Sequence, residues 1–354
     1  MPNKVRWGVL STAKIAVKKV IPAMQQSEWV EVVAIASRDP GKAEEHARAL
    51  GIPKAYGSYE ELLADPRIEA IYNPLPNPLH VPWSIQAAEA GKHVLCEKPL
   101  SVTVAEAEAL LKVQQRTGVV IAEAFMVRNH PQWLRAREVV AAGRIGTLRS
   151  IHGCFSYFNT DPANIRNIPE FGGGSLMDIG CYLINTSRLL FGEEPLRVLG
   201  LMERDPALKV DRLTSAMLEF PSGQSVFTCS MQLIYYQRMQ LLGTKGRIEI
   251  PTPFTPPTDR ATHILIDDGS DLAGGGVTTE TFPVCNQFTI QGEVFSRAVR
   301  EGTRVPVPIE DAIKNMAVIE AIVCSAQSGR WESPRGPGIP SVPSGGGFSA
   351  AGAD

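Results

Sequence analysis

The first third of the chain alternates short apolar runs with amphipathic stretches. Five runs have the length and composition of buried strands, at 5–10, 30–37, 68–73, 92–97 and 119–124. Helices are expected between and after them, at 13–26, 41–50, 58–65, 77–91 and 103–118. Because strand and helix alternate with short connections, the pattern predicts a parallel sheet with helices on both faces.

From about residue 126 the pattern changes to closely spaced strands. Helices are expected at 131–142 and, after a glycine-rich turn, at 179–191. Strand-like runs lie at 146–158, 196–203, 212–220, 224–231, 236–242, 246–250, 263–267 and 278–284. Helices at 286–301 and 309–327 are expected to close this second part. Closely spaced strands with Gly and Pro turns predict one large, mostly antiparallel sheet.

The pattern therefore divides the chain into an α/β domain at 1–125 and an α+β domain at 126–330 with a large open sheet. The remainder, 331–354, is rich in Pro, Gly and Ser and is expected to be a flexible tail. A chain of 354 residues is longer than one hydrophobic core usually serves, which agrees with two domains.

Composition excludes several classes of function. A net charge of -2 gives no electrostatic reason to expect nucleic acid or an anionic membrane as a partner. No apolar run reaches the roughly 18 residues of a membrane span, and the N-terminus enters a strand without room for a signal peptide. The 6 cysteines are scattered, with no C-x-x-C pair, so no metal site is expected. The same pattern predicts a reduced, cytoplasmic protein.

The turn after the first strand, "VLSTAKIA", is a candidate nucleotide site. A dinucleotide-binding turn favours glycines at three positions, which here hold Ser11, Ala13 and Ala16, all small. Taken alone, the turn is equally consistent with a plain strand-turn-helix. Its position in the alternating pattern favours a Rossmann domain, with backbone N–H groups meeting a pyrophosphate. The candidate residues in this turn are Ser11, Thr12, Ala13, Lys14 and Ile15.

The end of the second strand indicates which dinucleotide is bound. An acid there holds the ribose of NAD, whereas an arginine suits the 2′-phosphate of NADP. The chain places Ser37 and Arg38 there, with Lys42 nearby. NADP is therefore favoured, with NAD as the alternative cofactor. The alternative for Arg38 is an ordinary solvated arginine with no ligand.

Two motifs, "AGKHVLCEKPL" at 90–100 and "GGGSLMDIGCYLIN" at 172–185, carry a resemblance. With them, the sequence resembles the Gfo/Idh/MocA oxidoreductase family over residues 4 to about 330. It is most similar to the branch of NADP-dependent D-xylose 1-dehydrogenases and dimeric dihydrodiol dehydrogenases. That branch has tyrosine four residues after the aspartate, here Tyr182 after Asp178.

The resemblance implies roles for residues of both motifs. Lys98 would reach the reacting carbon, Tyr182 would act as acid and base, and Asp178 would place the substrate. Glu97 would lie by the nicotinamide ribose. The segment "PLPNPLH" would form the cofactor wall through Pro74, Leu75, Asn77 and His80.

The chemistry of these residues agrees with such roles. Oxidising a sugar hydroxyl requires a base, and a tyrosine serves as one at neutral pH only when a cation such as Lys98 stabilises its phenolate. Asp178 and Tyr182 are spaced to share one helix face. Structural alternatives are a helix cap for Asp178 or Asn77 and aromatic packing for Tyr182. Further candidate substrate contacts are Arg128, His130 and Arg166.

The sequence thus predicts an NAD(P)-dependent oxidoreductase of a sugar or polyol, of the D-xylose 1-dehydrogenase type. The alternatives are a trans-dihydrodiol dehydrogenase, a ketosugar reductase, or an NADP-sensing regulator without activity. A homodimer or homotetramer formed through the second sheet is also expected, because a sheet covered by helices on one face leaves the other to be covered.

Overall fold

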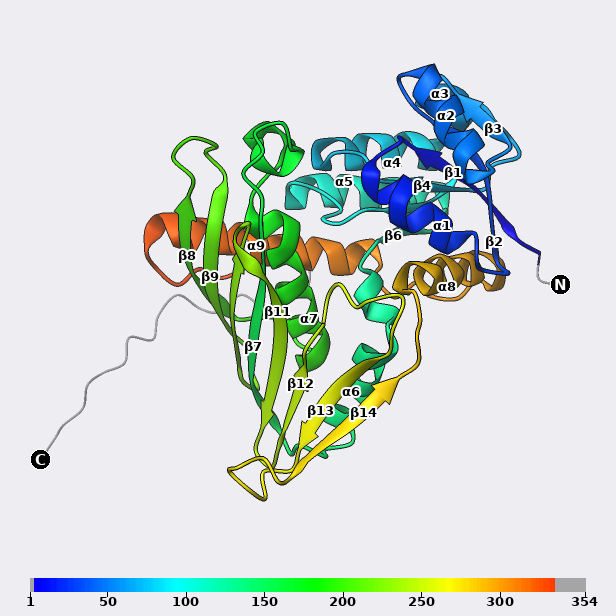
Figure 1. Ribbon diagram of the computed structural model, residues 1–354. Coiled ribbons are helices and arrows are strands. Elements are labelled where there is room, and N and C mark those ends of the chain that lie inside the picture. The colour runs from blue at the N-terminus through cyan, green and yellow to red at the C-terminus, as the bar shows by residue number, and fades with distance from the viewer. Residues whose placement is uncertain (1–2, 335–354) are drawn as a thin grey trace, which may run out of the picture.

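Two sheets organise the chain in the computed structural model, which describes residues 3–334 (Figure 1). The first has six parallel strands in the order β3-β2-β1-β4-β5-β6. Their bounds are β1 Val5–Leu10, β2 Val30–Ala36, β3 Lys54–Tyr56, β4 Ala70–Asn73, β5 His93–Cys96 and β6 Ile121–Glu123. The predicted parallel sheet is confirmed. β3 is an additional strand, whose partly exposed residues form no apolar run, whereas the equally short β6 is fully buried.

Helices cover both faces of this sheet. One face carries the π-helical turn η1 (Ala16–Val20), α1 (Ile21–Met24), α2 (Pro40–Leu50) and α8 (Gln287–Glu301). The other carries α3 (Tyr59–Ala64), α4 (His80–Glu89), α5 (Val104–Thr117) and the start of α9 (Ile309–Ser328). Side-chain caps set where several helices begin: Asp39, Ser58 and Thr103 accept N–H groups from the first turns of α2, α3 and α5.

The position of α8 differs from the sequence-based expectation that it closes the second part of the chain. It packs on the first sheet instead, where the Phe295 ring lies 5.1 Å from the Trp7 ring and Trp7 Nε1 donates to Ser296 Oγ over 3.1 Å. The reason is hydrophobic burial, because this face of the sheet presents Trp7 and other apolar side chains that α8 covers. Helix α9 contacts both α5 and the second sheet.

The second sheet has eight strands in the order β14-β13-β12-β11-β7-β10-β9-β8, all antiparallel except the β7–β10 pair. Their bounds are β7 Leu148–Phe158, β8 Arg197–Arg204, β9 Asp211–Glu219, β10 Gln224–Ser230, β11 Gln232–Gly243, β12 Arg247–Ile250, β13 Thr262–Asp267 and β14 Val277–Phe282. The mostly antiparallel sheet predicted from the sequence is confirmed.

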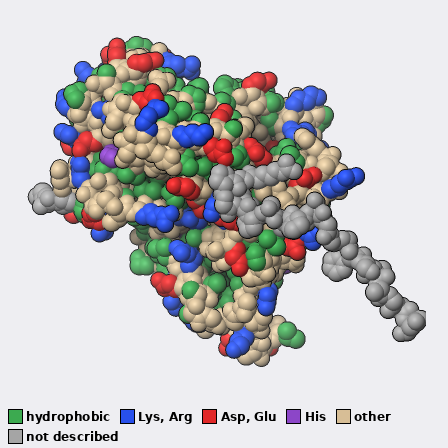
Figure 2. Space-filling model, turned by 180° about the vertical axis from the view of Figure 1, so that it is seen from behind, with side chains coloured by type: hydrophobic (Ala, Val, Ile, Leu, Met, Phe, Trp, Pro, Cys, Tyr) green, Lys and Arg blue, Asp and Glu red, His purple; other side chains and the backbone are tan. Residues whose placement is uncertain are grey.

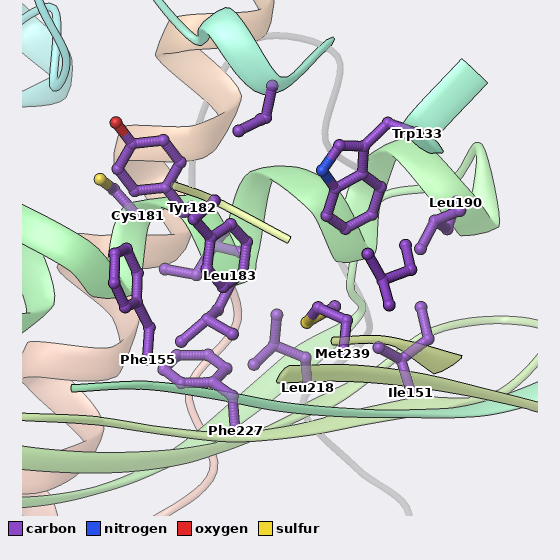
Figure 3. Packing of buried hydrophobic residues seen from close by; sticks show 14 of the residues in the cluster. Trp133, Ile151, Phe155, Cys181, Tyr182, Leu183, Leu190, Leu218, Phe227 and Met239 are labelled. Atoms are coloured by element: carbon purple, nitrogen blue, oxygen red, sulfur yellow. The ribbon is translucent and has the colours of Figure 1, made fainter. Parts of the chain in front are cut away.

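Helices α6 (Pro131–Ala141), α7 (Cys181–Phe191) and α9 lie on one face of this sheet, and in the described residues no helix lies on the other (Figure 1). Figure 3 shows the core between α7 and the strands, where Tyr182 and Leu183 lie close to Phe155 and Phe227. The core therefore anchors α7, whose N-terminal end forms part of the site described below.

The expected flexible tail at 331–354 is corrected at its start. Glu332 forms an antiparallel bridge with Val198 of β8, and the Arg197 guanidinium lies 4.7 Å from the centre of the Trp331 ring. These contacts satisfy backbone groups of an edge strand that has no other neighbour on that side in the described chain. The rest of the predicted tail, 335–354, lies outside the described residues.

Candidate active site

Lys98 lies just beyond β5, at the carboxyl edge of the parallel sheet, where such folds bind ligands. Its peptide bond to Pro99 is cis. The side chain is 11% exposed, and its Nζ donates to the main-chain oxygen of Asp178 over 2.5 Å and to Asp178 Oδ1 over 3.2 Å. Residues 80 positions apart in the sequence thus meet across the two parts of the chain.

Asp178 collects donors from three different segments. It lies in the π-helical turn η6 (Leu176–Gly180) that leads into α7, and its side chain is 14% exposed. Tyr157 of β7 donates to Oδ2 over 2.6 Å. Arg166, in the short helix η4 (Ile165–Asn167), brings Nε to 2.9 Å from Oδ1. Asp178 is therefore an acceptor for three side chains and caps no helix, so the structure does not support the alternative of a helix cap.

The charges of this group fix its protonation. Burial alone would raise the pKa of Asp178, but Lys98 and Arg166 hold it well below its usual range. Burial would lower the pKa of Lys98, and the Asp178 carboxylate reverses this and raises it above its ordinary value. At neutral pH the lysine is therefore charged and the aspartate is ionised.

Tyr182 lies beside this group with its ring buried. Lys98 Nζ is 4.9 Å from the ring centre, a cation–π geometry, whereas the tyrosine hydroxyl lies 3.4 Å from Met126 Sδ. The Phe125 and Phe155 rings pack edge-on at 5.2 and 6.0 Å. Burial raises the pKa of Tyr182 despite the nearby lysine, so the hydroxyl keeps its proton. The aromatic packing named as a structural alternative is present, and Lys98 lies over the same ring.

Glu97 is also brought to this edge. Tyr72 of β4 donates to Glu97 Oε1 over 2.6 Å, and burial raises the pKa of Glu97. Tyr72 escaped the sequence-based reasoning because its role depends on the pairing of β4 with β5.

The segment 74–80 forms the adjoining wall. His80 is fully buried, with Nδ1 2.8 Å from the oxygen of Pro99 and Nε2 2.7 Å from that of Leu75. Asn77 donates from Nδ2 to the oxygen of Gly172 over 3.2 Å. The interpretation of Asn77 as a helix cap is therefore wrong: the short helix there begins without a side-chain cap, and the amide joins the loop before Asp178 instead.

The turn after β1 fits a dinucleotide although it lacks glycine. Ser11 has φ of +85°, the left-handed conformation that glycine usually supplies, and its N–H donates to the oxygen of Ala36 over 2.9 Å. Thr12 and Ala13 are partly exposed and small, and the chain then enters the helical segment that contains η1. The first N–H groups of a helix have no intrahelical partner and can meet a phosphate. Lys14 is exposed and Ile15 is half-buried in the same turn.

The end of β2 presents the residues expected to read the ribose. Ser37 Oγ accepts from the Asp39 N–H over 3.2 Å, while Arg38 and Lys42 are exposed at the start of α2. Both positive side chains are thus accessible beside the nucleotide turn, and this arrangement can accommodate a 2′-phosphate.

Two candidate substrate residues are not part of this group. The Arg128 guanidinium contacts Asn185 Oδ1 at 3.4 Å and lies 3.8 Å from Asp311 Oδ1. His130 is fully buried, caps α6 through Nδ1 and lies 3.4 Å from Cys285 Sγ through Nε2. A buried polar side chain needs a hydrogen-bond partner, and Arg128 and His130 find theirs away from the site. None of the contacts named here is with Lys98, Asp178 or Tyr182.

Tyr157 is a second site residue, after Tyr72, that sequence reasoning missed. It is two residues from the buried Phe155, so strand alternation places it on the face of the sheet that meets α7. That pattern gives the face of the strand and leaves the contact with Asp178 to the tertiary structure.

Residues 3–334 contain no group of three or more His, Cys, Asp and Glu side chains that could hold a metal ion. None of the helices formed by these residues is long and apolar enough to cross a membrane.

Comparison with known proteins agrees with both sheets. Residues 5–125 match the model of an oxidoreductase family with an NAD-binding Rossmann fold, and residues 133–249 match the GFO/IDH/MocA C-terminal domain. An uncharacterized oxidoreductase, ORF334, of Rhizobium meliloti is 47% identical over 93% of this chain and 99% of its own. D-xylose 1-dehydrogenase (NADP(+)) 2 of Haloferax volcanii is 41% identical over 91% of this chain and 98% of its own.

Two further matches come from more distant proteins. Trans-1,2-dihydrobenzene-1,2-diol dehydrogenase of Mus musculus is 35% identical over 71% of this chain and 76% of its own. The crystal structure of KijD10, a 3-ketoreductase from Actinomadura kijaniata in complex with NADP and TDP-benzene, superposes with a TM-score of 0.85. It is 29% identical, over 91% of this chain and 98% of that one.

The fold and the group around Lys98 define an NAD(P)-dependent oxidoreductase with a Rossmann domain. The chain belongs to the Gfo/Idh/MocA oxidoreductase family, as the two motifs predict.

Proposed function

We propose that this chain is an NADP-dependent sugar oxidoreductase of the aldose 1-dehydrogenase type. The observation that carries the proposal is the meeting of Lys98, Asp178 and Tyr182 at the carboxyl edge of the Rossmann sheet. The 41% identical relative named as an NADP-dependent D-xylose 1-dehydrogenase supports the substrate class.

The residues would divide the work as follows. Bound NADP supplies the hydride acceptor or donor. Lys98 presents a fixed positive charge to the oxygen of the reacting sugar carbon and stabilises negative charge that develops there. Tyr182 exchanges the proton of that oxygen, and Asp178 orients Lys98 and accepts a hydrogen bond from a sugar hydroxyl.

The cofactor preference rests on the start of α2. We expect Arg38 and Lys42, both exposed there, to contact the 2′-phosphate of NADP. Replacing Arg38 by Ala should weaken NADP binding by about tenfold or more, while NAD affinity stays the same, because only NADP carries that phosphate.

The test is a panel of aldoses, dihydrodiols and keto sugars offered with NADP and NAD, followed through the absorbance of the reduced nicotinamide. We expect aldose oxidation with NADP, abolished in Lys98→Ala. NADP binding without hydride transfer to or from any compound would contradict the proposal and support a regulator.

Keto-sugar reduction is the second candidate. It is favoured by the structural similarity to a 3-ketoreductase. Turnover of keto sugars with NADPH and none of aldoses with NADP would select this candidate.

We further propose a homodimer formed by the open face of the second sheet. Outward positions on its strands carry exposed apolar side chains, among them Phe158 at 69% and Leu201 at 77% exposure. Figure 2, which shows the molecule from behind the view of Figure 1, has acidic and basic side chains mixed, with no large patch of one sign. A monomeric mass in solution would contradict this proposal.

The six cysteines form no disulfide, which supports a reducing, cytoplasmic location.

A further inference from the structure

Two aromatic residues of strand β7, Phe155 and Tyr157, contact the two residues of the helical segment, Tyr182 and Asp178. Phe155 packs on the Tyr182 ring. Two residues further along the strand, Tyr157 donates a hydrogen bond to Asp178. Alternate residues of a strand are about 6.6 Å apart, close to the separation of residues four apart on a helix. The strand therefore holds both members of the Asp178–Tyr182 pair at once.

The hydrogen bond from Tyr157 decides how the Asp178 carboxylate is turned. Tyr157 occupies Oδ2, and this leaves Oδ1 to face both Lys98 and Arg166. The Arg166 side chain is 43% exposed, whereas the hydroxyl contact with Tyr157 is part-buried.

The orientation of Asp178 in turn decides where the Lys98 ammonium points. A lysine has three N–H donors, and two of them are used by the main-chain oxygen and Oδ1 of Asp178. One donor remains for the oxygen of a reacting substrate. If the carboxylate turned, Lys98 would follow Oδ1 and that donor would move with it.

We propose that Tyr157 is a positioning residue, which locks Asp178 so that Lys98 presents its remaining N–H group to the reacting oxygen. The inference rests on the proposed function, because it assigns Tyr157 a part in hydride transfer at the same site. Tyr157 itself is not the acid or base: burial and the Asp178 carboxylate raise its pKa, so it stays a hydrogen-bond donor.

The test is Tyr157→Phe, which removes one hydroxyl and keeps the ring. We expect kcat to fall by about 10- to 100-fold, the range for losing a hydrogen bond to a charged group, with KM changed less than about threefold. The double variant with Asp178→Asn should be no slower than Asp178→Asn alone, since both changes break the same connection.

A matched control exists elsewhere in the chain. Tyr56 donates to Asp65 Oδ2 over 2.6 Å, and that carboxylate is also bound by Arg67. Tyr56→Phe therefore removes the same type of hydrogen bond away from Lys98, and we expect kcat to stay unchanged.

A readout without turnover separates this inference from the proposed function. At neutral pH the 15N resonance of the Lys98 ammonium should shift in Tyr157→Phe and stay unmoved in Tyr56→Phe, because Lys98 follows Oδ1 when the Asp178 carboxylate turns. If the wild type transfers hydride to no sugar, the proposed function fails, and this resonance still decides the role of Tyr157.

Several results would overturn the inference. An unmoved Lys98 resonance, an unchanged kcat, or a rise in KM alone would mean that Tyr157 does not act through Asp178. Full additivity with Asp178→Asn, or an equal loss of kcat in Tyr56→Phe, would have the same meaning.

Discussion

Two regions of the molecule contain the same four residue types in nearly the same contacts. In the first domain, Asp65 accepts from Tyr56 and Arg67, and Lys92 donates to the Asp65 main-chain oxygen over 2.8 Å. At the candidate site, Asp178 accepts from Tyr157 and Arg166, and Lys98 donates to the Asp178 main-chain oxygen over 2.5 Å. We call these the Asp65 cluster and the Asp178 cluster.

The clusters differ in what their lysine touches. Lys92 reaches two main-chain oxygens, those of Asp65 and Ile68, and burial lowers its pKa. Lys98 also reaches a carboxylate oxygen and lies over the Tyr182 ring. A lysine bound to carbonyls ties a loop to its own domain, whereas a lysine on a carboxylate keeps a strong, oriented charge.

The clusters also differ in how far their parts are separated along the chain. Arg67 is two residues from Asp65, and its own N–H bonds the carboxylate over 2.9 Å. The Asp178 cluster joins the end of β5, strand β7, the short helix η4 and the π-helical turn η6. The same residue types thus stabilise a turn in the Asp65 cluster and form a candidate active site in the Asp178 cluster.

The largest expected difference comes from the lysines. Lys98→Met should reduce turnover by about 10³-fold or more, because it removes the charge that stabilises the reacting oxygen. Lys92→Met should leave kcat and KM unchanged and lower the melting temperature. Steady-state kinetics and thermal denaturation check both, and equal effects on kcat would contradict the comparison.

The aspartates should differ by less. Asp178→Asn should reduce kcat/KM by about 10²-fold, because Lys98 loses its ionic partner and the reacting sugar an acceptor. Asp65→Asn should leave kcat/KM as in the wild type and destabilise the first domain. The same two assays apply, and an Asp178→Asn enzyme at full activity would show that the second cluster is structural as well.

The arginines provide a finer test. Arg166→Ala should lower kcat/KM by about tenfold, since Tyr157 and Lys98 still hold Asp178. Arg67 is two-thirds exposed, and Arg67→Ala should not affect kinetics. Kinetics of the two variants under identical conditions give the result, and a loss in Arg67→Ala would remove the distinction.

The last test concerns stability rather than turnover, through the support of the loop that carries Lys98. Glu123 accepts from the Leu100 N–H over 2.8 Å, and burial raises the pKa of its carboxyl to about 8. Because this pKa lies above the unfolded value of about 4.3, the stabilisation is complete below that value and is lost as pH rises toward 8. The unfolding free energy should fall with pH at less than about 1.4 kcal/mol per unit.

The matched variant is Glu123→Gln, which keeps the acceptor for Leu100 and cannot ionise. Urea denaturation at pH 5, 6.5 and 8 should show this variant gaining stability relative to the wild type as pH rises. A constant difference across the series would mean that Glu123 is already ionised at pH 5 in the folded protein.

Much of the fold follows from local pattern. Period-two and helical patterns identify the strands and helices within a few residues, and Asp39, Ser58 and Thr103 fix helix starts through their own side chains. The edge strand β3 has no apolar run that would show it, whereas the equally short β6 is fully buried and was predicted. The packing of α8 on the first sheet was not predictable either, because an apolar helix face does not specify which sheet covers it.

By itself, the sequence determined that Lys98 ends a strand at the carboxyl edge of a parallel sheet and that Asp178 and Tyr182 lie near each other at the start of a helix. Strand and helix periods are local, so a single chain segment carries that information. Only the tertiary structure decided that Tyr157 holds Asp178, that Arg128 and His130 lie elsewhere, and that Lys98 rather than Lys92 meets a carboxylate. These contacts join residues distant in sequence, and they depend on how two sheets pack, which no local pattern encodes.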